Sequence, residues 1–268
     1  LFWPAMLKFA GRKTPDAINV HGFITVSGEK MSKSRGTGIS PLRYLEIGMN
    51  AEWLRYYIAA KLNARVEDMD FNPEDFIARV NSDLVGKYVN IASRAASFIT
   101  KHFDGALAYS GDTAALAAEY AEQAESIRAA FEAREYNRAI REIMAYADRI
   151  NQAFDTAQPW VLAKGIATAD DAQKAALQDI CSRSLAGFKA LSVMLAPVLP
   201  ALAERVAREL FASEANFTWA DAAVLPQRVA PFKHLMQRAE PQMLEDLFEP
   251  PAAPVVVPGG EPLAETIS

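Results

Sequence analysis

The stretch GEKMSKSRGTG, residues 28–38, gathers groups that can bind phosphate near the start of the chain. Lys30 and Lys33 lie three positions apart, and Ser32 and Ser34 add hydroxyl groups to the same short segment. Glycines at both ends of the segment let the backbone turn, so the ammonium and hydroxyl groups can converge on one anion. The alternative is a solvated basic turn, because lysine, serine and glycine are common in exposed loops.

A second polar set recurs along a helix that we predict between residues 72 and 105. At 100° per residue, its members fall within one stripe roughly 80° wide. The stripe consists of Lys87, Asn90, Arg94, Ser97 and Lys101. It can bind a polar ligand, or it is the solvated face that most amphipathic helices present to water.

Two kinds of element must position these groups. Before the basic segment, β-branched and aromatic residues between Ile18 and Val26 predict a short strand or hairpin that ends in a loop. From Met49 onward the pattern is helical almost throughout. Residues 49–63 read as one helix, and Asn72 followed by Pro73 starts a long second one. On that helix Ile77, Leu84, Ile91 and Phe98 recur every seven residues and predict a buried face.

The remaining sequence completes a mainly α-helical chain. Amphipathic stretches at 113–133, 136–157, 170–195 and 198–212 predict a bundle of about five helices with short connections. Residues 231–249 predict a short further helix. The proline- and glycine-rich residues 249–262 are typical of an extended linker that leads to a further domain.

Composition restricts the possible functions. Twenty-eight Lys and Arg against 33 Asp and Glu give a net charge of −5, so the chain has no general basic surface for nucleic acid, and any such contact must be local. The longest uncharged run, residues 190–203, contains two prolines and is too short to span a bilayer. The one cysteine, Cys181, excludes an internal disulfide and a multi-thiolate zinc site in this chain, and fits a reducing compartment. We expect a cytoplasmic protein with no membrane contact.

Lys30-Met31-Ser32-Lys33-Ser34 resembles the KMSKS signature of class I aminoacyl-tRNA synthetases. In a chain of this length the five letters would occur by chance with a probability on the order of 10⁻⁴. Further segments, in order along the chain, resemble the methionyl-tRNA synthetase family of the bacterial type. They are LFWPAML, VHGFITVSGEKMSKSRGT, LRYYIAAKL, VNIASRAASFITKHFDG, AQPWVLAK and PVLP.

The resemblance implies a fold and a domain order. Residues 1–27 correspond to the end of a Rossmann-type α/β catalytic domain, and 28–72 to the KMSKS loop and stem-contact region. Residues 73–221 correspond to the α-helical anticodon-binding domain, and 222–268 to a C-terminal helix and proline-rich linker. The apolar start at Leu1 does not resemble a signal peptide and reads as an entry partway through a longer protein. The family's HIGH-type motif and zinc knuckle would precede Leu1, so zinc is expected only there.

The resemblance also implies roles in ATP binding. Lys33 would stabilise the triphosphate of ATP, with Mg²⁺, while the carboxylate of methionine attacks the α-phosphorus. Met31 and Ser32 would belong to the same ATP site. Lys30 would bind ATP as well, or else hold the loop conformation or face solvent.

Two further residues near the start have roles implied by the same resemblance. His21 falls beside the active-site floor and would contact ATP. Trp3 falls near the pocket for the methionine side chain. For each residue the alternative is an ordinary side chain of the hydrophobic core.

Three residues fall on the family's anticodon-reading positions. Asn90 and Arg94, one helical turn apart, would hydrogen-bond to the edges of unstacked bases, and Trp160 would stack on a base. Pro159 can start a helix and turn Trp160 outward. A tryptophan platform of this kind contributes roughly 1–3 kcal/mol per base.

As a whole, the resemblance implies part of a methionine–tRNA ligase that acts on methionine, ATP and tRNA(Met). An appended C-terminal domain, through which relatives form homodimers, would follow Ser268. Without the HIGH-type motif, we expect the chain by itself to be inactive in methionine activation. Two alternatives stay open: a non-catalytic tRNA-binding helical module, and a helical scaffold in which Asn90, Arg94 and Trp160 are incidental.

Overall fold

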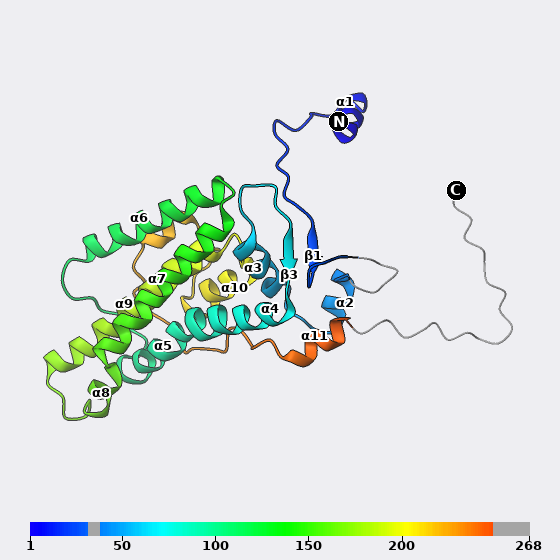
Figure 1. Cartoon of the computed structure of the whole chain (residues 1–268). Helices are drawn as coiled ribbons and strands as arrows, with labels where there is room; N and C mark the ends of the chain where they lie inside the picture. Colours follow the sequence, from blue (N-terminus) through cyan, green and yellow to red (C-terminus); the bar gives the residue numbers. More distant parts are fainter. Residues whose placement is uncertain (32–37, 249–268) are drawn as a thin grey trace.

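The computed structural model describes residues 1–31 and 38–248, in which a small sheet with short helices leads into a helical bundle (Figure 1). The sheet has the strand order β2-β1-β3. Its strands are β1 (Ile24–Val26), β2 (Glu29–Lys30) and β3 (Met69–Phe71). β1 is antiparallel to β2 and parallel to β3. The hairpin expected before the basic segment is therefore confirmed, whereas β3 was not foreseen.

Within the described residues, three short helices lie in the first quarter of the chain. They are α1 (Phe2–Phe9), α2 (Pro41–Glu46) and α3 (Ala51–Lys61). Ser40 caps α2 and Asn50 caps α3, because each side chain accepts a hydrogen bond from a backbone N–H of the first turn. The helix predicted within residues 49–63 is thus confirmed as α3.

The long helix predicted between residues 72 and 105 is confirmed as three consecutive segments. They are α4 (Pro73–Arg79), the π-helical segment η1 (Val80–Val89) and α5 (Asn90–Phe103). The side chain of Asn72 accepts a hydrogen bond from the Asp75 N–H at 2.8 Å and begins the helix. Asp104 and Gly105 end it with positive φ angles of 49° and 75°. The widened π-helical turns were not expected from the sequence.

The bundle packs around α9, whose second half is buried almost continuously. The helices are α6 (Thr113–Glu132), α7 (Tyr136–Ala157), α8 (Pro159–Lys164), α9 (Asp171–Leu195), α10 (Pro200–Arg205), which continues into η2 (Val206–Leu210), and the 3₁₀ helix η3 (Trp219–Ala223). Figure 1 shows α5, α7 and α9 running alongside one another. The expected bundle is confirmed, and Cys181 lies buried within it as a small core residue.

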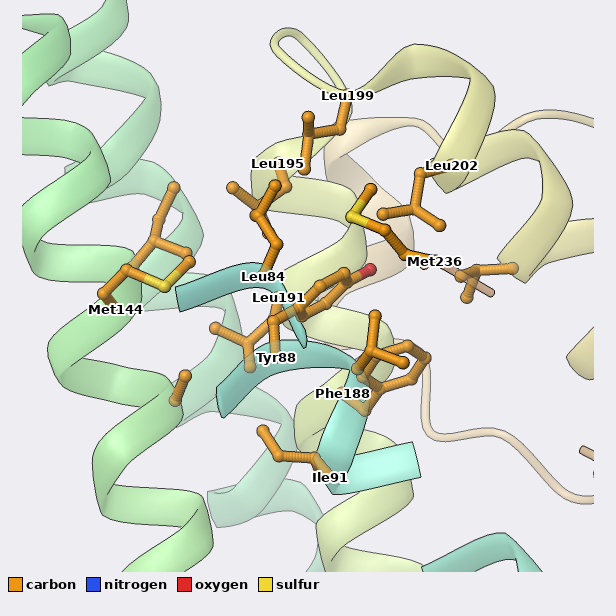
Figure 2. Packing of buried hydrophobic residues seen from close by; sticks show 14 of the residues in the cluster. Leu84, Tyr88, Ile91, Met144, Phe188, Leu191, Leu195, Leu199, Leu202 and Met236 are labelled. Atoms are coloured by element: carbon orange, nitrogen blue, oxygen red, sulfur yellow. The ribbon is translucent and has the colours of Figure 1, made fainter. Parts of the chain in front are cut away.

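The core joins the π-helical segment to α9. Tyr88 stacks on Phe188 with ring centroids 4.7 Å apart, and Leu84 and Leu191 lie beside this pair (Figure 2). The hydroxyl groups of Tyr88 and Ser192 are 2.6 Å apart in the same buried region. This contact fixes the height and rotation of the helix that carries the polar stripe.

The C-terminal helix α11 (Pro241–Phe248) returns to the small sheet and α2. The guanidinium of Arg43 donates two hydrogen bonds to the Asp246 carbonyl, at 3.2 and 3.1 Å. The rings of Phe71 and Phe248 lie 6.3 Å apart. Among the helices of the described residues, none has the length and apolar character that crossing a membrane requires.

Candidate nucleotide loop and nucleic-acid interface

The β1–β2 hairpin leads directly into the basic segment. Its turn has positive φ angles at both Ser27 (50°) and Gly28 (78°), as a two-residue hairpin turn with the natural strand twist requires. Lys30 lies in β2, and its backbone pairs with that of Thr25 in β1. Ser32 and Lys33, on which the phosphate-binding prediction rests, lie outside the described residues.

The two ends of that segment come together in the structure. A Cβ atom added to Gly38 would lie 3.7 Å from both Cβ and Sδ of Met31. Met31 itself is 38% exposed. Lys30 and Met31, which are predicted to contact ATP, therefore lie at the end of the hairpin, and Gly38 lies close to Met31.

Asp70 of β3 holds the hairpin turn in place. Its Oδ1 accepts hydrogen bonds from the Gly28 N–H at 2.7 Å and from the Thr25 hydroxyl at 2.8 Å. These two donors lower the pKa of Asp70, because they stabilise its ionised form. Lys61 donates to the Asp70 carbonyl at 3.0 Å. Sequence reasoning missed Asp70, since only the pairing of β1 with the distant β3 brings it to the turn.

The structure corrects two interpretations of residues near the start. His21 precedes β1 rather than lying on it, and its side chain is exposed, so its reading as a core histidine is wrong. Trp3 is 72% exposed on α1, which has no buried residue, so its reading as a core tryptophan is also wrong. Figure 1 shows α1 standing apart from the sheet and the bundle. Within the described residues, Trp3 and His21 are not brought to the hairpin turn.

Arg94 and Trp160 meet at the end of the bundle. The Cζ atom of Arg94 lies 5.6 Å from the centroid of the Trp160 ring and 4.8 Å from that of Phe154. The rings of Phe154 and Trp160 are 6.4 Å apart. Arg94 also forms an ion pair with Asp155. One cation thus rests on two aromatic rings and beside one carboxylate, an arrangement that fixes its planar group.

A sharp reversal of the chain creates this cluster. α7 ends at Gln158 in the left-handed conformation, with φ 47°, and the buried Pro159 begins α8. The reversal places Trp160 beside Phe154 of the preceding helix. The expected helix start at Pro159 is confirmed, and Trp160 is partly exposed while it packs against the core.

The other members of the polar stripe differ in their surroundings. Asn90, one turn before Arg94, is partly exposed. Lys87 forms an ion pair with Asp148 of α7 at 2.9 Å. The hydroxyl of Ser97 donates to the Arg94 carbonyl at 3.0 Å and so turns back to its own helix. Lys87 of η1 and Arg94 of α5 therefore form a seam with α7, whereas Ser97 and Lys101 of the same stripe are exposed.

Sequence reasoning missed Phe154 and Asp155 as parts of this cluster. Phe154 reads as one more apolar position of α7, and Asp155 as one more exposed acid. The signal that could have found them is their position just before Gln158-Pro159, where a chain reversal returns the following aromatic residue to the end of α7.

The arrangement suits unpaired bases. A partly exposed indole can stack on a base, and a guanidinium and an amide one turn apart can hydrogen-bond to base edges. In the parts of the chain that the structure describes, no group of three or more His, Cys, Asp or Glu residues could hold a metal ion.

The comparison with protein families defines the class. Residues 1–96, which include the sheet, the hairpin and the start of the long helix, match the family model described as tRNA synthetases class I (M). Across 87% of the chain, the structure resembles Mycobacterium tuberculosis methionyl-tRNA synthetase in complex with methionyl-adenylate, with a TM-score of 0.73 and 28% sequence identity. The match covers 46% of that chain.

Curated relatives specify the family. The methionine–tRNA ligase of Methylibium petroleiphilum is 57% identical over 286 residues, which cover 100% of this chain and 40% of the relative. That of a Janthinobacterium species is 58% identical over 257 residues, which cover 94% of this chain and 36% of the relative. The chain belongs to the methionyl-tRNA synthetase family and spans less than half the length of these relatives.

Proposed function

We propose that this chain is the part of a methionine–tRNA ligase that supplies the KMSKS loop and recognises the anticodon of tRNA(Met). Residues 1–72 contribute the end of the catalytic domain and the loop with its stem-contact region. Residues 73–221 read the anticodon, and residues 222–268 form the C-terminal helix and linker. The observation that supports this most directly is that Arg94 and the partly exposed Trp160, which are far apart in the sequence, lie together in one cluster.

The proposed anticodon site uses three groups. Trp160 supplies the stacking platform, while the Arg94 guanidinium and the Asn90 amide hydrogen-bond to base edges. Phe154 and Asp155 hold the guanidinium in the absence of RNA. Binding then requires Arg94 to exchange its carboxylate partner for a base, so a base that fits poorly leaves the ion pair unbroken.

The proposed activation step needs charge neutralisation rather than covalent catalysis. A carboxylate oxygen of methionine attacks the α-phosphorus of ATP, the bond from that phosphorus to the bridging oxygen breaks, and pyrophosphate leaves. A terminal ribose hydroxyl of tRNA then attacks the methionyl carbonyl and AMP leaves. Lys33 would bind the developing negative charge on pyrophosphate, and Lys30, Met31, Ser32 and His21 would contact ATP. Mg²⁺ would arrive with ATP as its counterion.

The binding half of this proposal is tested with RNA and this chain. Fluorescence anisotropy at one fixed salt concentration compares a labelled stem-loop carrying CAU with one altered at a single anticodon base. We expect Trp160→Ala to weaken CAU binding about 5- to 150-fold, the equivalent of one lost stacking contact of roughly 1–3 kcal/mol. Arg94→Lys keeps the charge and loses the planar fork, so it should reduce discrimination between the two RNAs more than it reduces affinity.

Lys101→Ala is the matched control, because Lys101 is an exposed cation of the same helix beyond the Arg94 cluster. Equal binding of both stem-loops by the unmodified chain would contradict anticodon recognition by these residues. The catalytic half needs the complete ligase. There, Lys33→Ala should lower the rate of methionine-dependent ATP–pyrophosphate exchange and leave stem-loop binding unchanged.

A further inference from the structure

A polar cleft of about 420 Å³ opens where the long helix passes α3 and α7. Its charged lining consists of Arg79, Asp83 and Lys87 from α4 and η1, and of Arg141 and Asp148 from α7. The floor is apolar and includes Ile140 and Met144 of α7. The cleft lies outside the Arg94–Trp160 cluster, and the proposed function assigns it no role.

Most charges in the cleft are already paired. Lys87 lies 2.9 Å from Asp148 and 3.9 Å from Asp83, and Asp83 also accepts a hydrogen bond from the Tyr56 hydroxyl at 2.9 Å. Arg79 Nε lies 3.5 Å from Asp75 Oδ1, yet this buried nitrogen makes no hydrogen bond. The carboxylates of Asp83 and Asp148 therefore already have partners, whereas the Nε–H group of Arg79 has no hydrogen-bond acceptor among the described residues.

Arg141 is the cation that stands out. Its side chain is exposed at the cleft, and within the described residues it makes neither a hydrogen bond nor an ion pair. By contrast Arg138, one turn earlier on the same face of α7, is held between Glu135 at 2.7 Å and Glu142 at 2.8 Å. The cleft thus carries one guanidinium that is free to bind an anion, next to a second one whose Nε lacks a hydrogen bond.

The cleft lies in line with the Arg94–Trp160 cluster. Lys87 pairs with Asp148 and Arg94 pairs with Asp155, so the same ion pair repeats after seven residues on both helices. Arg141 precedes Asp148 by another seven residues on α7. At 1.5 Å per residue, Arg141 is roughly 20 Å along α7 from Asp155. Asn151 stabilises this seam, because its side-chain amide donates to the π-helical carbonyl of Lys87 at 3.2 Å.

We propose that this cleft binds a backbone phosphate of the RNA stem whose unpaired bases reach Arg94 and Trp160. The proposal rests on the proposed function, since it takes the RNA to lie along the seam. Arg141 would bind the phosphate through two parallel N–H···O contacts, and Arg79 would add a second positive charge. Lys87 stays paired with Asp148 and offsets the repulsion between that carboxylate and the phosphate. The site recognises charge and position and reads no sequence.

The test measures salt dependence with this chain. The CAU stem-loop and its altered form are titrated at a series of KCl concentrations, with Arg141→Ala and Arg138→Ala as a matched pair of variants. Loss of one phosphate contact should flatten the slope of log K against log[salt] by about 0.7–0.9 for Arg141→Ala. The weakening should be the same for both stem-loops, because a phosphate contact carries no base information. Arg138→Ala should leave the slope unchanged.

A third RNA locates the contact. The single-stranded anticodon loop without its stem should bind the unmodified chain and the Arg141→Ala variant equally. An unchanged slope for Arg141→Ala, an equal change for Arg138→Ala, or a loss that persists with the loop alone would each overturn the proposal.

This experiment also separates the two proposals. If Trp160→Ala left discrimination intact while Arg141→Ala still flattened the slope, the anticodon assignment would fail and the phosphate site would stand. Both substitutions are at partly or fully exposed positions, so a thermal melt of each variant matching the unmodified chain establishes that folding is not the cause.

Discussion

The buried hydroxyl pair beneath the polar stripe gives a sharp test of how the long helix is held. Ser192 donates to the Phe188 carbonyl at 2.7 Å, so its oxygen is free to accept from Tyr88, 2.6 Å away. Burial raises the pKa of Tyr88, and its hydroxyl is therefore a proton donor at every ordinary pH. Removing Ser192 leaves the Tyr88 hydroxyl without a partner, whereas removing the Tyr88 hydroxyl leaves Ser192 bonded to its carbonyl.

The expected costs follow from that asymmetry. Tyr88→Phe removes the donor and leaves the Ser192 hydroxyl with its carbonyl partner, which costs about 1 kcal/mol of unfolding free energy. Ser192→Ala leaves the fully buried Tyr88 hydroxyl without an acceptor, which costs roughly 1–3 kcal/mol. The double variant has no orphaned hydroxyl at either position. It should therefore be no less stable than Ser192→Ala alone, although it lacks more polar atoms.

Urea denaturation of the four proteins measures this cycle, with equal m-values required before the free energies are compared. Costs that simply add in the double variant would refute the reasoning, because they would mean that the two hydroxyls do not interact. Tyr88→Phe keeps the ring that stacks on Phe188. Its affinity for the CAU stem-loop should consequently stay within about twofold of the unmodified chain, a change below ~0.5 kcal/mol.

Three further predictions concern single positions. Gly105→Ala should cost more than about 1 kcal/mol of stability and more than Gly111→Ala, since both have positive φ but only the first would bring a Cβ atom to 2.4 Å from the Val229 carbonyl; equal urea midpoints would contradict this. Burial raises the pKa of Glu52 above its usual 4.5, so the folded chain binds that proton more tightly. The unfolding free energy of Glu52→Gln minus that of wild type should accordingly increase as pH rises from about 4.5. Urea titrations of both proteins measure this difference, and a decrease with rising pH would contradict the prediction. The pKa of Asp70 is lowered from 3.8, so wild type should lose its stability advantage over Asp70→Asn as pH falls below that value, and a constant difference would refute the role given to its hydrogen bonds.

The helices could be predicted from the sequence because their signals are local. Asn72 with Pro73 gives the start of the long helix, and Gly105 gives its end. The predicted ranges 136–157 and 170–195 compare with Tyr136–Ala157 and Asp171–Leu195 in the structure. Caps, apolar periodicity and breakers within a few residues of each boundary are sufficient for this.

The sheet and the π-helical turns could not be predicted in the same way. β3 is three residues long, and its strand conformation depends on pairing with β1, some 45 residues earlier. The π-helical segment Val80–Val89 is poor in strong helix formers, with three valines and Gly86, and no local pattern in it specifies the wider turns. Its wider turns are stabilised by tertiary contacts, such as the hydrogen bond from Asn151 to Lys87, that no local pattern contains.

The candidate site likewise has parts that could be predicted from the sequence and parts that depend on contacts between distant residues. Asn90, Arg94 and Trp160 could be selected from motif order and family resemblance. The ion pair of Arg94 with Asp155 and its contact with Phe154 could not, because both depend on how the chain reverses at Gln158. The exposure of Trp3 and His21 was missed for a related reason: apolar or aromatic character at one position does not say whether another element covers it.

Under the proposed function, the paired charges along the seam account for selective RNA binding by a chain with a net charge of −5. Lys87 and Arg94 each have a carboxylate partner, so an RNA phosphate approaching at random must displace that partner before it gains an ion pair. The exchange yields little net free energy, because one charge-assisted contact is lost for each one gained. Non-specific binding along the seam should therefore be weak. A stem-loop whose base stacks on Trp160 gains a contact with no such competitor, and one whose phosphate reaches Arg141 meets a cation that has no carboxylate partner within the described residues. We therefore expect selectivity along the seam to come from Trp160 and Arg141, whose contacts displace no carboxylate of the described residues.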